Sequence, residues 1–216
     1  MRFIVSPAKK MSVVDDSFAC RSLPQFIDDA ERLLGALRAL SYDQAKELWG
    51  CSDALAELNF ERVRTMDLRA EGALTPAVVA YEGIQYQHLA LRVMDEAQLA
   101  YVQEHLRILS GFYGVLRPLD GVVPYRLEMQ AKLAAGDRLY RTLADETDVI
   151  VNLASVEYAK AVLPHAKAAG MRAPRIVTCL FGTIDAQGRL KQRATAAKAA
   201  RGSMVRWCAE HNVQHP

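Results

Sequence analysis

Apolar residues recur with helical spacing over much of the first half of the chain, and this periodicity stops near residue 106. Between residues 22 and 64, and again between 95 and 106, apolar residues recur every three or four positions, the spacing of a helix with one buried face. Ser22, Ser41 and Asp95 each stand three positions before a glutamine, the pattern of a capping box at a helix start. The sequence therefore predicts a helical region from about residue 22 to 106.

Short, largely apolar runs predict the strands. The runs at 2–5, 77–81 and 148–153 are typical of buried strands. Residues 174–191 contain two further extended stretches around Asp-Ala-Gln-Gly, a favourable hairpin turn. A final helix is expected over 193–209.

The order of these elements predicts an α+β fold. No internal repeat, low-complexity tract or linker divides the chain, so we expect one compact domain over residues 1–216. We expect a mixed sheet with surrounding helices. Along the chain, the helical region would be followed by hairpin and cleft loops at 107–130. C-terminal strands and a basic helix would occupy 148–209.

The loop region begins with Leu-Ser-Gly-Phe-Tyr-Gly at 109–114, which fits the hairpin of a helix-hairpin-helix element. Gly111 and Gly114 would let the backbone turn tightly and bring its N–H groups close to a phosphate. Such hairpins hold the nucleic-acid backbone without reading its sequence. The alternative is an ordinary glycine-containing turn.

Charge is distributed unevenly along the chain, although the net charge is only +2. Residues 1–159 hold 17 Lys and Arg against 23 Asp and Glu, whereas residues 160–206 hold 10 Lys and Arg and a single acid, Asp185. A basic face of this kind usually meets phosphates. The alternative is a solvated helix and hairpin whose cations contact nothing.

Other features of the composition narrow the class of protein. No apolar run approaches the roughly 20 residues that span a bilayer, and the N-terminus lacks the form of a signal peptide. We therefore expect a cytoplasmic protein without membrane contact. The four cysteines are widely spaced and form no Cys/His cluster, so neither a metal site nor a disulfide framework is expected. No cofactor motif is present.

Candidate chemistry gathers where predicted strands end, a common place for sites in α/β sheets. Ser6 and Lys9 follow the first strand, and a second group follows the strand at 148–153. Its members are polar residues beside a predicted helix start: Asn152, Ser155, Glu157, Tyr158 and Lys160. Ser155 is explained equally well as a helix cap.

Two arginines in the loop region are further candidates for phosphate, because the planar guanidinium binds two oxygens at once. These are Arg117 and Arg126. The alternative is that they fix loop geometry by pairing with carboxylates, Arg117 with Asp120 and Arg126 with Glu128.

Five segments of the chain together resemble the signature of the peroxide-stress YaaA family. Their order along the chain is that of the family, and they extend over most of the chain. They are Ser6–Lys9, Leu109–Asp120, Pro124–Met129, Asn152–Tyr158 and Lys198–Gly202.

The resemblance implies a cytosolic protein of the peroxide response that binds double-stranded DNA and is linked to lowered free iron. It also implies a compact α+β fold with a helix-hairpin-helix and a basic cleft. Because no spacing here is typical of an iron site, any effect on iron would be indirect. With the basic run, the resemblance gives an expected phosphate-binding set: Ser6, Lys9, Gly111, Gly114, Arg117, Arg126, Asn152, Ser155, Lys160, Lys198 and Arg201.

Two other functions remain open. The mixed polar set would also suit an enzyme acting on a nucleotide or nucleic acid, by base-excision-like or glycosidic chemistry, with Lys9, Asp120, Glu157 and Tyr158 as candidate catalytic groups. The third interpretation is a structural domain with a buried polar network.

The chain departs from the family pattern in two places. It is shorter between residues 129 and 148, and it ends at Pro216, soon after Gly202. If the missing parts complete the cleft, we expect weaker binding or a second subunit, as in a homo-oligomer.

Overall fold

A five-stranded mixed sheet lies at the centre of the protein. The computed structural model describes residues 1–14, 18–127, 141–144, 146–167 and 173–216. The strand order is β6-β5-β1-β8-β9, with β6 antiparallel to β5 and the other neighbours parallel. The strands are β1 (Arg2–Val5), β5 (Leu106–Ser110), β6 (Gly114–Leu116), β8 (Val149–Asn152) and β9 (Arg175–Thr178).

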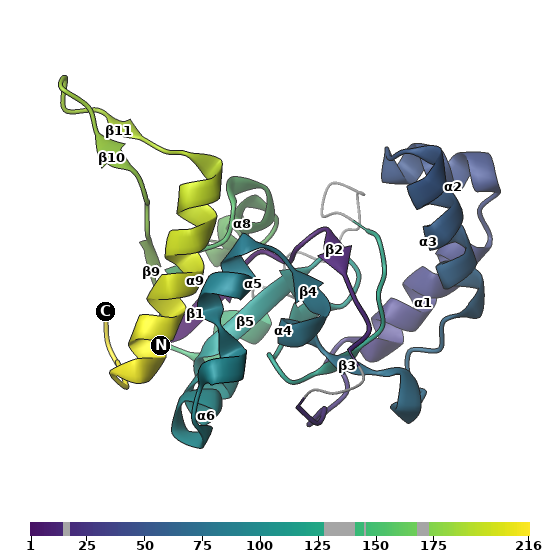
Figure 1. The fold of residues 1–216 in the computed structure, drawn as a ribbon, viewed down its shortest axis with the longest axis horizontal. Helices are drawn as coiled ribbons and strands as arrows, with labels where there is room; N and C mark the ends of the chain where they lie inside the picture. Colours follow the sequence, from purple (N-terminus) through teal and green to yellow (C-terminus); the bar gives the residue numbers. More distant parts are fainter. Residues whose placement is uncertain (15–17, 128–140, 145, 168–172) are drawn as a thin grey trace.

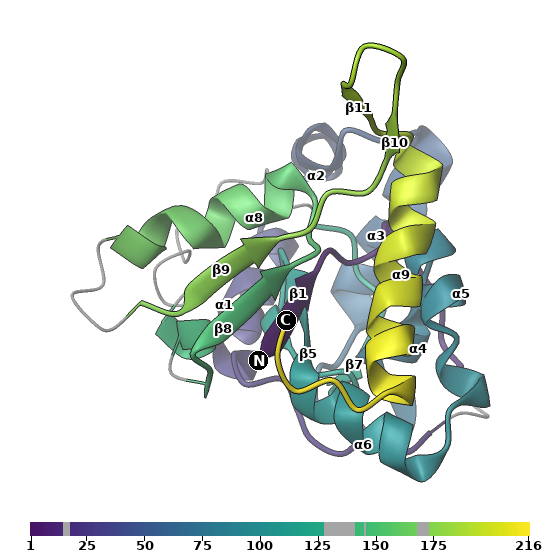
Figure 2. The same cartoon turned by 90° about the vertical axis from the view of Figure 1, so that its left-hand side faces the viewer.

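Helices cover both faces of this sheet (Figure 2). Phe3 and Val5 of β1 face a core formed with α5 (Ile84–Leu89), α6 (Glu96–His105) and α9 (Ala194–Glu210). Ile4 faces the opposite way and packs with α8 (Val156–Val162). The alternation of one strand thus buries both faces, and the predicted α+β class with a mixed sheet is confirmed.

One close contact fixes α9 against α5. A Cβ built on Gly202 would lie 2.0 Å from the carbonyl oxygen of Gln85 and 2.9 Å from the amide nitrogen of Leu89. Only glycine permits two helix backbones to approach so closely. The position of the basic helix α9 therefore depends on this residue.

Three helices form a lobe beside the sheet, at the right of Figure 1: α1 (Ile27–Arg38), α2 (Tyr42–Trp49) and α3 (Asp53–Thr65). The predicted capping box of Ser41 and Gln44 is confirmed, as is that of Asp95 and Gln98 at α6. The one predicted for Ser22 is wrong. The Ser22 hydroxyl donates to Asp120 at 2.6 Å, and α1 begins only at Ile27.

Short elements connect the lobe to the sheet. Residues 77–80, predicted as strand, form the helix α4 (Ala77–Ala80). A short apolar run fits a buried helical turn as well as a strand, so periodicity cannot separate them. The remaining small elements are β2 (Lys10–Met11) paired with β4 (Tyr81–Glu82), β3 (Thr75–Pro76) paired with β7 (Gly121–Val122), and the 3-10 turns Glu71–Ala73, Leu91–Val93 and Leu163–Lys167.

The predicted helix-hairpin-helix at 109–114 is wrong. These residues form the end of β5, a tight turn and the start of β6. The Ser110 hydroxyl accepts the backbone N–H groups of Phe112 and Tyr113 at 3.2 and 2.9 Å, and Gly114 adopts φ +75°. The N–H groups of Phe112 and Tyr113 are therefore bonded within the turn, whereas the hypothesis required such N–H groups to bind a phosphate.

A two-stranded arm projects from the body at the upper left of Figure 1. It pairs β10 (Thr183–Ile184) with β11 (Leu190–Lys191) around the predicted turn. The preceding strand β9 does not enter this hairpin, because it completes the edge of the main sheet beside β8.

Candidate functional site

The topology of the sheet marks one position as a ligand site. From β1 the chain reaches β5 through α6 on one face, whereas from β8 it reaches β9 through α8 on the other face. The neighbouring strands β1 and β8 are therefore left by the chain toward opposite faces and opposite edges of the sheet. In open α/β sheets, ligands bind at the carboxyl ends of strands at such a switch point. Here those ends carry the loops Ser6–Lys9 and Leu153–Ser155.

Ser6 ties the switch-point loops together. Its hydroxyl oxygen accepts the backbone N–H of Ser155 at 2.8 Å and lies 3.1 Å from the Ser155 hydroxyl. The Ser6 carbonyl accepts hydrogen bonds from Tyr86 (2.9 Å) and Gln85 (3.2 Å) of α5. The predicted pair Ser6 and Ser155 is therefore brought together and held in place from the α5 side.

Asn152 supports the second loop from within. Its side-chain oxygen accepts the backbone N–H of Ala154 at 3.0 Å, and its amide donates to the Thr178 hydroxyl at 3.3 Å. Since Asn152 is buried, it positions the loop rather than offering itself to a ligand.

A chain of buried phenols lies beneath the same edge. The Tyr125 hydroxyl is 2.9 Å from that of Tyr81 and 2.7 Å from that of Ser110. Burial raises the pKa of Tyr81, Tyr86 and Tyr125, and the charges of Tyr125 and Tyr158 raise that of Tyr86 further. These phenols are therefore neutral hydrogen-bonding groups at physiological pH and not bases.

Cations flank the edge from α8, α9 and the loops. Lys9, Lys160 and Lys198 are exposed, and Arg126 and Arg201 are half-buried. Arg201 follows Lys198 by one helical turn and precedes Gly202, which contacts Gln85, the residue that bonds Ser6. The helix that carries these two cations thus packs against α5, which in turn holds Ser6.

Arg201 combines burial with the lack of a counter-ion among the described residues. Its Nε, like those of Arg2 and Arg126, is buried without a hydrogen-bond acceptor, and within the part of the chain that the structure describes its guanidinium makes no ion pair. Burial lowers the pKa of Arg201. A partly desolvated cation without a counter-ion attracts an anionic ligand. Glu157 carries the matching feature of opposite sign, a buried Oε1 without a donor.

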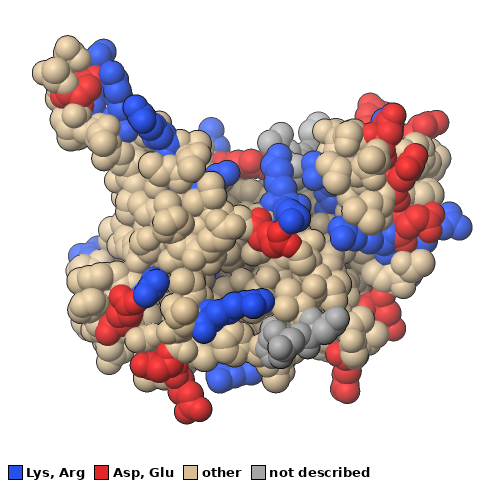
Figure 3. Space-filling model, in the orientation of Figure 1, with Lys and Arg blue, Asp and Glu red and all other residues tan. Residues whose placement is uncertain are grey.

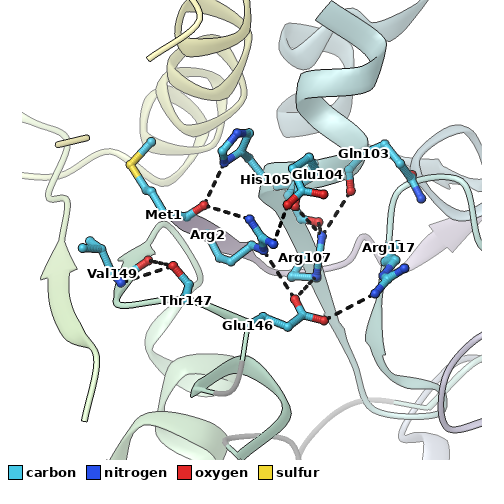
Figure 4. Close-up of polar contacts among 11 residues, drawn as sticks. Met1, Arg2, Gln103, Glu104, His105, Arg107, Arg117, Glu146, Thr147 and Val149 are labelled. Atoms are coloured by element: carbon cyan, nitrogen blue, oxygen red, sulfur yellow. Dashed lines mark hydrogen bonds and ion pairs between the residues drawn. The ribbon is translucent and has the colours of Figure 1, made fainter. Parts of the chain in front are cut away.

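Arg117 and Asp120 lie at the other end of the sheet, by the amino ends of the parallel strands. There Glu146 binds the buried Arg107 at 2.7 Å and also contacts Arg2 at 3.5 Å and Arg117 at 3.7 Å (Figure 4). These two residues are therefore not brought together with Ser6 and Ser155.

The charges at this opposite end satisfy one another. Asp120 accepts from the Ser22 hydroxyl and, at 2.8 Å, from the backbone N–H of Arg117, so the expected side-chain pair is replaced by a backbone hydrogen bond. Burial raises the pKa of Asp120. A cavity of about 240 Å³ borders Arg107, Arg117 and Glu146. Because its ions are paired with one another, this network stabilises the fold and does not form a ligand site.

Several residues of the switch-point edge are not among the site residues predicted from the sequence: Ser110, Tyr81, Gln85, Tyr86, Tyr125 and Thr178. Their only sequence signal is a polar group inside or directly after an apolar run, which is common in any core. The predicted Gly111 and Gly114 lie at the same edge but shape the β5–β6 turn. Glu128 lies outside the described residues.

Metal-binding clusters, thiols and membrane spans concern the remaining classes of site. Across the described ranges, no three His, Cys, Asp or Glu residues are grouped so as to hold a metal ion. Burial raises the pKa of Cys20, Cys179 and Cys208, which keeps these thiols protonated and weakly nucleophilic. No helix in the described part of the chain is long and apolar enough to cross a bilayer.

Fold and site define an α+β protein with a largely parallel sheet, a polar switch point and flanking cations. The whole chain, residues 1–216, matches the family model described as peroxide stress protein YaaA. The chain therefore belongs to this family, and the resemblance found in its motifs is confirmed.

Similar proteins occur in several bacteria under the description UPF0246 protein. One from Pediococcus pentosaceus is 49% identical over 100% of this chain and 87% of its own length. Others from Lachnoclostridium phytofermentans and Lactiplantibacillus plantarum are 48% and 46% identical, each over 99% of this chain and over 85% and 87% of their own lengths.

Proposed function

We propose that this member of the peroxide stress family binds double-stranded DNA through its phosphate backbone, with Arg201 and Lys198 of α9 at the centre of the contact. The observation that carries the proposal is the half-buried Arg201, which has neither an ion pair nor an acceptor for its Nε among the described residues. A phosphate oxygen would supply both, since the planar guanidinium suits phosphate geometry.

The surface around Arg201 supports the same partner. Figure 3 shows Lys and Arg along the projecting arm at upper left, with one acidic patch at its tip, and both acidic and basic residues over the α1–α3 lobe at right. A polyanion is therefore attracted to the arm more strongly than to the lobe, where acids and cations are mixed. Contacts through lysine and arginine to phosphates carry no sequence information, so binding would be largely independent of sequence.

We place this activity in the cytosol, where DNA coverage would protect against oxidative damage and lower free iron only indirectly. The support is the family description as a peroxide stress protein. In this proposal the basic surface of α9 replaces the glycine hairpin, whose N–H groups are already bonded to Ser110.

The test is fluorescence anisotropy with a short labelled duplex of mixed sequence. The double variant Lys198→Gln/Arg201→Gln should lose about tenfold in affinity or more at low salt. The matched control, Arg32→Gln/Arg64→Gln, removes the same charge from exposed positions of the lobe and should bind as the unchanged protein does. Equal losses in both variants, or no binding by the unchanged protein, would refute the proposal.

A second candidate function is an enzyme acting on a nucleotide or nucleic acid at the switch point. It is favoured by the buried, donor-free Oε1 of Glu157, at the same edge as Lys9, Tyr158 and the Ser6–Ser155 pair. A carboxylate with a lysine would serve glycosidic chemistry. Asp120, the fourth candidate, lies at the opposite end of the sheet.

Base release from nucleosides, nucleotides and abasic or damaged duplexes, followed by chromatography, tests this candidate. An enzyme should lose turnover in Lys9→Ala and Glu157→Gln while its DNA affinity stays within about twofold. Absence of any released base from all of these substrates would reject it.

A further inference from the structure

The β10–β11 arm exposes apolar side chains away from any core. Leu180, Ile184 and Leu190 are 66%, 67% and 40% exposed. Each strand of the arm has only two residues, and an isolated two-stranded hairpin is marginally stable in water. Apolar residues gathered on such an element indicate a contact surface.

The tip of the arm is nevertheless built as a fixed structure. The carboxylate of Asp185 accepts the backbone N–H groups of Gln187 and Arg189, both at 2.9 Å, and the Arg189 side chain at 3.0 Å. Lys191 lies 3.5 Å from the same carboxylate. Near the base of the arm, a Cβ on Gly182 would lie 2.5 Å from the Lys191 carbonyl. Preorganisation of this kind reduces the entropy lost on binding.

The charge of the arm selects the partner. Asp185 is the single acid between residues 160 and 206, and its side chain is 8% exposed because it is used within the turn. Arg189, Lys191 and Arg193 are exposed around it. The arm leads directly into α9, the helix that carries Lys198 and Arg201. Figure 3 shows Lys and Arg along the arm itself.

The two cross-strand residue pairs of the arm lie on opposite sides of the hairpin, one apolar and the other polar. Ile184 pairs with Leu190 across the strands, and Thr183 pairs with Lys191, so the two pairs face opposite sides. The major groove of DNA admits a two-stranded ribbon and presents the thymine methyl group for apolar contact. The cations of such a ribbon lie close to the phosphates that border the groove.

We propose that the β10–β11 arm enters the major groove of double-stranded DNA, with Ile184 and Leu190 against thymine methyl groups and Arg193 toward the backbone. The proposal rests on the proposed DNA-binding function and adds a groove contact to the backbone contact of α9. It predicts a mild preference for duplexes rich in thymine, set by the arm alone.

Duplexes in which uracil replaces every thymine test the groove contact, because they differ only by the methyl group. The unchanged protein should bind a thymine-rich duplex about fourfold more tightly than its uracil counterpart, the factor for burying one methyl. Ile184→Ala/Leu190→Ala should bind both duplexes equally and match the uracil value. Leu55→Ala/Leu58→Ala, which shortens two exposed leucines of α3, should retain the preference.

The outcomes separate this inference from the proposed function. If the unchanged protein binds duplex DNA and loses affinity in Lys198→Gln/Arg201→Gln, but shows no methyl preference, the arm proposal is wrong and backbone binding stands. No duplex binding at all refutes both. If Ile184→Ala/Leu190→Ala leaves the methyl preference intact but converts a dimer to a monomer in light scattering, the arm joins two copies of this chain instead.

Discussion

At the scale of single residues, the contrast between paired and unpaired charges locates the candidate site. Arg107 is 2% exposed and donates to Glu146 and to three backbone carbonyls, so its charge is compensated within the fold. Arg201 is also partly desolvated but makes no such bonds among the described residues. The two arginines look alike in the sequence. Only tertiary contacts distinguish a structural cation from one that is available to a phosphate.

His105 gives a prediction at this scale. Burial lowers its pKa below 6.5, although the hydrogen bond to the Met1 carbonyl at 2.8 Å opposes the shift. The unfolded chain therefore binds the proton more readily, and stability falls as the pH drops from about 6.5 toward the folded pKa. His105→Asn keeps a donor near Nδ1 but cannot titrate. Urea unfolding at pH 5.5 and 7.5 should show a smaller loss in this variant than in the unchanged protein.

The exposed His88 offers the control for this measurement. His88→Asn should retain the pH dependence of the unchanged protein. An undiminished acid loss in His105→Asn would show that other groups produce it.

Local patterns predicted residue roles only where no distant partner competed. Ser22 and Ser41 both stand three positions before a glutamine, yet only Ser41 caps a helix. The hydroxyl of Ser22 is bonded to Asp120, which lies 98 positions along the chain. A capping preference worth about 1 kcal/mol is easily overridden by a buried hydrogen bond to a carboxylate.

At the scale of elements, the contact between α5 and α9 decides where the basic helix lies. Gly202→Ala would place a methyl group 2.0 Å from the Gln85 carbonyl, so the helices must separate. We expect a loss of about 2 kcal/mol or more in the free energy of unfolding, the cost of overpacking against backbone atoms. Displacement of α9 should also weaken DNA binding through Lys198 and Arg201.

Gly35→Ala in α1 is the matched control, since no atom lies within 4 Å of the added Cβ. It should stabilise the protein by about 0.5–1 kcal/mol, because alanine restricts the unfolded chain. Denaturant melts of both variants measure the difference. Similar stabilities would mean that the two helices tolerate a wider separation.

Element types followed from the sequence for the long periodic helices and for two short apolar strands, and failed at two other short segments. The helices of the α1–α3 lobe and α6, and the strands β1 and β8, were predicted from their patterns. The segment 77–80 and the hairpin at 109–114 were not, because four to six residues carry no decisive period. The switch point requires the strand order, in which β1 lies between β5 and β8, and no local pattern contains it.

At the scale of the whole molecule, the polarity of charge matters more than its sum. The net charge is +2, yet residues 160–206 hold 10 Lys and Arg against one acid, and cations line the projecting arm (Figure 3). DNA bound to this surface would release condensed counter-ions in proportion to the phosphates neutralised. The salt dependence of binding therefore reports the basic surface directly, independently of the net charge.

Five cations make up this surface in our proposals: Arg189, Lys191, Arg193, Lys198 and Arg201. Arg189 and Lys191 are paired with Asp185. If each of the other three neutralises one phosphate, a plot of log affinity against log salt should have a slope of about −2.7. Lys198→Gln/Arg201→Gln should reduce the steepness by about 2, and Arg193→Gln by about 1, whereas Arg32→Gln/Arg64→Gln on the lobe should leave it unchanged. Anisotropy titrations between about 50 and 200 mM salt measure the slopes. A slope near zero for the unchanged protein would mean that phosphates are not its ligands, and the switch point would then be tested with neutral nucleosides.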